Sequence, residues 1–171
     1  LTPEYQKRMV QMNYHEGVNN APQWEASFCY PEGYMRWWAQ ASGGGNFQLT
    51  MSPALVQLLS GVAANFLRQF LVGRPQHVQK VPQWYGEAIA FWDGPKLVVW
   101  TANVQAWTIS HSMFEFSGQL ETIETFEPRR DASGNFIGLT SETWFYDAEA
   151  FVQPLYTLLH YNRQAKMDDA N

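Results

Sequence analysis

Residues 84–101 have the sequence WYGEAIAFWDGPKLVVWT, and this stretch decides the fold class. Two runs of small, β-branched and aromatic residues flank Asp93-Gly94, a pair that favours a tight hairpin turn. In the second run, residues 96–104, side chains on both alternating faces are apolar. The stretch therefore predicts two adjacent antiparallel strands whose two faces are both covered.

Short runs of the same kind recur about every ten residues on both sides of this hairpin, separated by turn signals. Residues 54–62 are also compatible with one helix, because a short apolar run does not distinguish the two structures. We interpret all eight runs as strands: 47–51, 54–62, 65–72, 86–92, 96–104, 119–127, 135–146 and 154–162.

Eight hairpin-connected strands close most economically into an up-and-down barrel with room for one small ligand. We therefore predict an all-β fold, an eight-stranded antiparallel lipocalin-like barrel over residues 47–171. Residues 1–46 form an irregular or short-helical N-terminal arm packed on it, with a helix over residues 1–12 that Thr2 caps. The competing prediction is an open antiparallel sheet with the arm covering one face.

Length and charge limit the possible partners. A chain of 171 residues with 46% hydrophobic content suits one domain, and its net charge of −5 comes with no basic cluster beyond Arg129-Arg130. No run of 18 apolar residues is present, and Cys29 is the single cysteine. We expect no nucleic-acid partner, no membrane insertion and no internal disulfide.

Aromatic residues make up 16% of the chain, more than packing alone needs. They indicate either a bulky core or an aromatic-lined pocket. Because Trp84, Trp92 and Trp100 lie in the most strand-like segment, we expect all three to be largely buried. The full set of predicted ligand-binding residues is Trp84, Tyr85, Trp92, Trp100, Trp107 and Tyr156.

Strand alternation places two charged residues, Arg68 and Glu124, on the apolar faces of their predicted strands. If both faces point inward, the two must pair, because a lone buried ion costs several kcal/mol. The pair is then either a structural ion pair or a polar floor that orients a ligand carbonyl or hydroxyl, with Glu124 as a candidate general base. The alternative is a register slip that puts both residues in water. His111, between two serines in the 105–118 loop, is the other candidate acid or base, or simply closes the loop by hydrogen bonding.

Metal and cofactor signals are weak. His111 and Glu115 have helical ligand spacing but no second matched pair, and the Gly-rich residues 42–45 lack the Lys and Thr of a phosphate loop. We expect neither a metal nor a cofactor.

Several of these motifs resemble a family of uncharacterised exported bacterial proteins. Residues 84–101 are similar to its pattern W-x-G-x-S-x-G-x-W-x-G-D-T-L-V-V-x-T, with Ala88 for the Ser and Pro95-Lys96 for the Asp-Thr. Residues 29–33, 68–74, 110–124 and 147–154 resemble further family motifs. The resemblance implies a periplasmic or secreted protein whose signal peptide has been removed, and it implies no activity.

Three functions fit these observations. The first is binding of a hydrophobic, aromatic or terpenoid-like small molecule inside the barrel. The second is a cofactor-free lyase, isomerase or hydratase in which Glu124 or His111 transfers a proton and Arg68 or a tyrosine stabilises an oxyanion. The third is a structural or assembly subunit, a homo-oligomer for example, because two-sided apolar strands need covering.

Overall fold

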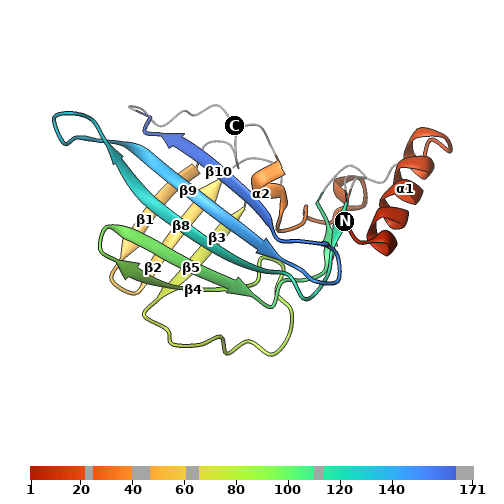
Figure 1. Ribbon diagram of the computed structural model, residues 1–171, viewed down its shortest axis with the longest axis horizontal. Coiled ribbons are helices and arrows are strands. Elements are labelled where there is room, and N and C mark those ends of the chain that lie inside the picture. The colour runs from red at the N-terminus through yellow and green to blue at the C-terminus, as the bar shows by residue number, and fades with distance from the viewer. Residues whose placement is uncertain (22–24, 40–46, 61–65, 110–113, 165–171) are drawn as a thin grey trace.

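The protein folds around one curled sheet of eight strands (Figure 1). The computed structural model describes residues 1–21, 25–39, 47–60, 66–109 and 114–164. The sheet strands are β1 (Phe47–Ser52), β2 (Leu55–Ser60), β3 (Leu67–Val72), β4 (Glu87–Asp93), β5 (Lys96–Ala102), β8 (Glu121–Arg130), β9 (Phe136–Tyr146) and β10 (Leu155–Asn162). Each predicted strand matches one of these, so the mostly β prediction is confirmed.

The sheet differs from the predicted barrel in two ways. Its strands follow the order β1-β2-β3-β4-β5-β8-β9-β10, and no pairing joins β1 to β10 within the described residues, so the sheet is a half-barrel. One neighbouring pair, β3 and β4, is parallel, whereas all the other pairs are antiparallel. The prediction of a closed, fully antiparallel barrel was therefore wrong.

The parallel pair arises from residues 73–86, which form a crossover instead of a hairpin. Gly73 donates its backbone N–H to Ala90 at 2.8 Å, and the chain then runs along the outside of the sheet. The side chain of His77 packs against Trp100 of β5, and Gln83 donates its N–H to the carbonyl of Asn103. The crossover thus returns the chain to begin β4 in the same direction as β3.

The N-terminal residues contain three helical segments: α1 (Pro3–Gly17), the 3-10 helix η1 (Glu25–Phe28) and α2 (Arg36–Ala39). The predicted first helix is confirmed and extends beyond residue 12. Thr2 precedes it, but its hydroxyl donates to the carbonyl of Glu149 instead of capping the helix. Tyr5 is buried and also bonds Glu149, so α1 is held to the turn between β9 and β10.

Residues 32–39 fill the concave side of the curled sheet. Tyr34, Met35 and Trp37 are each less than 5% exposed and contribute to two buried clusters. One cluster joins α1 to the short hairpin of β6 (Trp107–Thr108) and β7 (Glu115–Phe116), which the sequence did not predict, and the other lies against β2 to β5. The arm is therefore part of the core and not a cover on its surface.

The burial of the tryptophans was predicted incorrectly. Trp84 is half-buried, but Trp92 and Trp100 are 47% and 39% exposed. Trp92 is the second-last residue of β4 and lies outside the buried cluster, and Trp100 points to the outer face of β5. Alternation separates the two faces of a strand, but it does not show whether another layer covers the outer face.

Close backbone approach fixes the position of the filling segment at Gly33. A methyl group added there would collide with the backbone carbonyl oxygen of Thr108 and press on the ring of Phe116. We therefore expect Gly33→Ala to lower the free energy of unfolding by about 1–3 kcal/mol, the usual cost of overpacking. Gly118→Ala, which meets no atom within 4 Å, is the matched control for urea denaturation. Equal stability of the two variants would contradict this contact.

Candidate functional site

A buried ion pair lies at the centre of the concave face. Arg68 of β3 donates through Nη1 to Glu124 Oε2 of β8 at 3.1 Å, and through Nη2 to Glu124 Oε1. The Arg68 residue is 3% exposed and Glu124 is 0% exposed. Both side chains point inward because each occupies the buried parity of its strand. The predicted pairing is confirmed.

Tyr34 and Thr122 complete the hydrogen bonds of this pair. Arg68 Nη2 donates to the Tyr34 hydroxyl at 3.2 Å, and that hydroxyl lies 2.8 Å from Thr122 Oγ1 and 3.4 Å from Glu124 Oε1. A buried charge needs such additional partners, because Coulomb attraction alone does not offset desolvation. The network is therefore closed by a residue from the N-terminal arm.

Aromatic rings surround the guanidinium of Arg68. Its Cζ lies 4.8–5.4 Å from four ring centroids, within the range of cation–π attraction, and these rings belong to Tyr34, Trp37, Trp38 and Phe70. Trp37 also donates from Nε1 to the hydroxyl of Tyr161 at 3.2 Å, and Trp38 donates to Thr143 at 3.0 Å. Side chains thus occupy the interior in which the sequence analysis placed a ligand.

Burial and charge perturb the pKa values of this network. Desolvation alone would lower the pKa of Arg68, but attraction to the Glu124 carboxylate raises it above its usual value. The pKa of Tyr34 is raised to about 12, first by burial and then by the charge of Glu124. Burial likewise raises the pKa of Tyr161 to about 12. At neutral pH the charged arginine thus faces neutral tyrosines.

The geometry favours the structural interpretation of the pair. A general base must reach a proton of the substrate, but Glu124 is completely buried and both of its oxygens bind Arg68. Proton transfer by Glu124 stays a prediction. The other catalytic candidate, His111, lies outside the described residues.

A pocket of about 350 Å³ opens where β3 and β4 separate. The two strands pair only over residues 70–72 and 88–90, so the chain before each paired stretch leaves a gap between them. Three of the predicted site residues, Arg68, Trp84 and Tyr85, line this pocket. Its other lining residues are Leu67, Gln69, Phe70, Leu71, Gln79, Gln83, Gly86, Glu87 and Ala88.

The two aromatic rings that line the pocket, Trp84 and Tyr85, are packed against other aromatic rings. Tyr85 packs on Phe66 with ring centroids 4.9 Å apart, and Trp84 packs on Trp107 at 5.1 Å. Trp84 Nε1 donates to the backbone carbonyl of Glu32 at 3.0 Å. Burial and the charge of Glu32 raise the pKa of Tyr85 to about 12. Both rings are therefore held in place by neighbouring aromatic rings, and Trp84 is also bound to the segment that fills the concave face.

Glu87 holds the crossover against the pocket. Its Oε2 accepts the backbone N–H groups of Val78 at 2.8 Å and Gln79 at 2.9 Å. Its Oε1 is buried and has no hydrogen-bond partner among the described residues. A buried acceptor without a partner is destabilising by roughly 1–3 kcal/mol. Among the described residues, Thr101, Trp107, Thr108 and Thr157 also have a buried side-chain atom without a partner, but only Glu87 lines the pocket.

The remaining predicted ligand residues do not meet at the pocket. Trp92, Trp100 and Tyr156 are exposed, and Trp107 packs behind Trp84 between that ring and Tyr30. Sequence reasoning also missed Tyr34, Trp37 and Trp38, although the density of aromatic residues in 34–38 was a signal for core. Glu87 and the pocket glutamines carried no comparable signal, because they depend on where the crossover runs.

Two features of the described residues bear on partners. No group of three or more His, Cys, Asp or Glu side chains close enough to hold a metal ion occurs in the described part of the chain. Within the same part, every helix is too short or too polar to cross a membrane.

Comparisons with protein families, with curated proteins and with solved structures found no match to this chain. The resemblance to exported bacterial proteins stays a prediction from the motifs alone. Function must therefore be argued from the geometry of this molecule.

The ion pair provides a direct test of the concave network. Removing one partner leaves an uncompensated buried charge, so we expect Glu124→Gln or Arg68→Met alone to destabilise the protein by about 3–5 kcal/mol. The double variant should cost much less, and urea denaturation of all four proteins gives the coupling free energy. Additive losses, within about 0.5 kcal/mol, would show that the side chains do not interact. The exposed pair Lys96–Glu127, at 3.5 Å, is the control and should couple by less than about 1 kcal/mol.

Alkaline pH should weaken the same network through Tyr34. Its pKa rises from 10.0 to about 12 on folding, so its stabilising contribution is complete below pH 10 and is lost as pH rises through 12. A shift of two pH units corresponds to roughly 3 kcal/mol. Tyr34→Phe should therefore lose less unfolding free energy between pH 10 and 12 than the unmodified protein. Tyr14→Phe, at a 55% exposed position, is the control, and equal slopes in both variants would refute the assignment.

Proposed function

We propose that this protein is a binding module for a small, ring-containing molecule, and that the ligand occupies the pocket between β3 and β4. The observation that carries the proposal is the meeting of Trp84 and Tyr85 with a polar wall in a pocket of about 350 Å³. Ligand sites are typically concave, mostly apolar and provided with a few oriented polar groups. This pocket has both kinds of wall.

The lining residues indicate the chemistry of the ligand. Leu67, Leu71 and the two aromatic rings offer apolar contact, whereas Gln69, Gln79 and Gln83 carry amides that both donate and accept hydrogen bonds. A ligand hydroxyl that reaches Glu87 Oε1 would give this oxygen the partner that it lacks. The volume is at the lower end of the range for ligand sites, which favours monocyclic or bicyclic phenols and terpenoids over sterols.

The proposed ligand site therefore differs from that of a lipocalin-like barrel, in which the ligand lies inside the barrel. In our proposal the ligand lies at an opening between two strands, since Trp37, Trp38 and the Arg68–Glu124 pair occupy the concave face. Export to the periplasm or beyond is part of the same proposal and rests on the family resemblance. Neither proton transfer nor assembly has a comparable observation in its favour at this pocket.

Filling the pocket tests the proposal. We expect at least one compound from a panel of phenols and monocyclic terpenoids to raise the melting temperature, because binding to the native state stabilises it by about 2.7 kcal/mol at a hundred times the dissociation constant. Gln69→Trp, which places a bulky ring at the pocket wall, should weaken that binding at least about tenfold in titration calorimetry, a change of about 1.4 kcal/mol.

Thr50→Trp provides the matched control, since Thr50 is an exposed residue of β1 outside the pocket lining. It should bind the same compound with unchanged affinity. If no compound stabilises the protein, or if both variants bind equally well, the pocket is not the binding site.

A further inference from the structure

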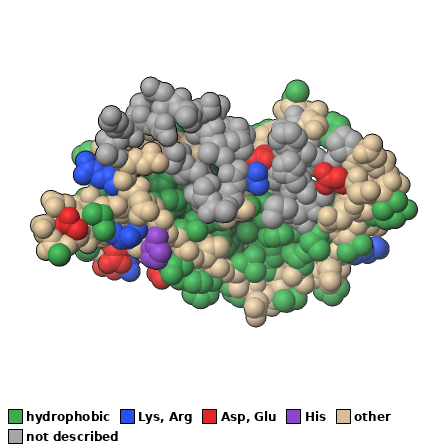
Figure 2. All heavy atoms as spheres, turned by 90° about the horizontal axis from the view of Figure 1, so that it is seen from above, with side chains coloured by type: hydrophobic (Ala, Val, Ile, Leu, Met, Phe, Trp, Pro, Cys, Tyr) green, Lys and Arg blue, Asp and Glu red, His purple; other side chains and the backbone are tan. Residues whose placement is uncertain are grey.

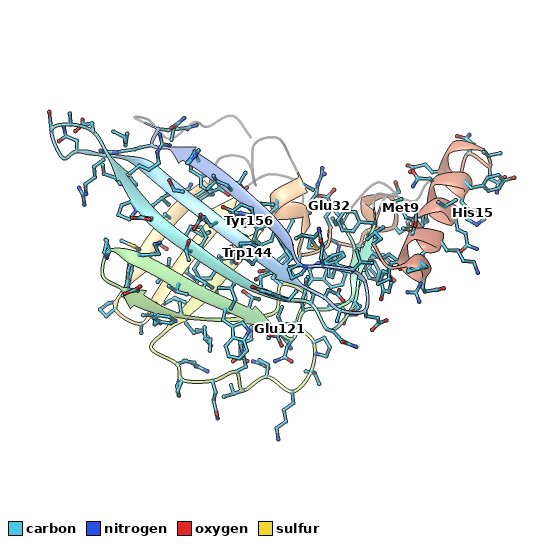
Figure 3. The ribbon with its side chains drawn as sticks, viewed as in Figure 1. Met9, His15, Glu32, Glu121, Trp144 and Tyr156 are labelled. Carbon is cyan, nitrogen blue, oxygen red and sulfur yellow. The ribbon has the colours of Figure 1, made fainter. Side chains whose placement is uncertain are left out.

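The outer face of the sheet carries a row of large apolar side chains at one level of four neighbouring strands. Trp100 of β5 lies directly opposite Ile123 of β8, Ile123 lies opposite Trp144 of β9, and Trp144 lies opposite Tyr156 of β10. The three aromatic residues are 39%, 44% and 44% exposed, in that order. Trp144 and Tyr156 lie beside each other over β9 and β10 (Figure 3).

The rings of this row are fixed in place. Trp100 donates from Nε1 to Glu121 Oε2 at 3.0 Å, and the ring of His77 packs against it at 4.3 Å. Tyr156 donates its hydroxyl to Glu142 Oε1 at 3.0 Å, and its ring lies 4.6 Å from that of Trp144. Rings that are already oriented lose little side-chain entropy on binding.

The row presents two aromatic surfaces separated by Ile123. Adjacent strands are about 4.8 Å apart, so Trp100 and Trp144 are about 10 Å apart along the row. Each aromatic surface has a carboxylate at its edge. Seen from above, the molecule as a whole has hydrophobic side chains gathered across its middle (Figure 2). The Trp144 and Tyr156 rings are inclined to each other by 44°. Apolar ring faces edged by hydrogen-bond acceptors match a pyranose, which has apolar C–H faces and hydroxyl groups around its rim.

We propose that this row binds a neutral, extended β-linked glycan. One sugar ring stacks on Trp100, a second sugar two residues along the glycan stacks on the Trp144–Tyr156 surface, and hydroxyls of the glycan donate to the second carboxylate oxygens of Glu121 and Glu142. The spacing of the two surfaces suits every second ring of such a chain. The glycan lies across the strands, over β5, β8, β9 and β10.

Charge argues for a neutral glycan over a polyanion. A single-stranded nucleic acid also stacks on aromatic rings, but it requires a positive groove, whereas this row has Glu121 and Glu142 in a protein of net charge −5. A second copy of the chain on this face would bring these carboxylates from both copies into a desolvated interface. A sugar hydroxyl satisfies a carboxylate without adding charge.

The row is separate from the pocket of the proposed function. None of Trp100, Trp144 and Tyr156 lines that pocket, so variants of the two sites can fail independently. The glycan proposal does not rest on the small-molecule proposal.

Binding to cellohexaose, measured by titration calorimetry and tryptophan fluorescence, tests the row. We expect Trp144→Ala and Tyr156→Ala each to weaken association by roughly tenfold, as loss of a stacking surface would. Both residues are exposed, and unchanged melting temperatures will show that the variants fold. Trp92→Ala is the matched control, because Trp92 is similarly exposed at 47% but lies outside the row, and its affinity should stay within about twofold.

Three outcomes would overturn the proposal. They are absence of binding to cellohexaose and xylohexaose at millimolar concentration, equal affinity of the Trp144→Ala and Trp92→Ala variants, and saturable binding of tetramethylammonium or oligolysine at this row in place of the glycans. The last result would identify the row as a cation–π site.

Discussion

The buried Arg68–Glu124 pair is the interaction on which the rest of the structure depends. It joins β3 and β8, which are not neighbours in the sheet, so it can form only when the sheet curls and brings the two strands face to face. Once desolvated, the charges require further partners, and Tyr34 supplies one from the N-terminal arm. The pair therefore links the curvature of the sheet to the position of the segment that fills it. That segment must approach closely, which explains the glycine at position 33.

Because side chains fill the concave face, the proposed binding sites lie elsewhere on the sheet. The interior of a small barrel is either filled by side chains or holds one small ligand, and here aromatic rings around Arg68 occupy the corresponding space. Among the described residues, two other regions offer exposed binding surface. One is the separation of the parallel strands β3 and β4, and the other is the partly exposed outer face of β5 and β8 to β10, where Trp100, Trp144 and Tyr156 lie. Both are consequences of how the strands connect.

Much of this arrangement could be predicted from local pattern. Each strand has alternating or continuous apolar residues between turn signals, so all eight were found, and the same alternation placed Arg68 and Glu124 on inward faces. The path of residues 73–86 could not be predicted, because the Gly73-Arg74-Pro75 signal ends a strand without showing where the chain goes next. Residues 32–39 lack periodicity, and their burial depends on the pair that they complete. Exposure of Trp100 depends on what covers the sheet, which no local pattern records.

The crossover connects the two outer regions physically. Its Val78 and Gln79 bind Glu87 at the pocket, while the preceding residue, His77, packs on Trp100 and lies 3.1 Å from its carbonyl oxygen through Nε2. If a ligand displaces residues 78 and 79 and His77 moves with them, the contact that orients the Trp100 ring changes too. Thermodynamic linkage makes such an effect reciprocal, so occupancy of the outer row would bias the pocket by the same free energy. If instead the crossover keeps its position when either site is filled, binding at one site does not change the affinity of the other. The two regions then act as independent sites on one rigid sheet.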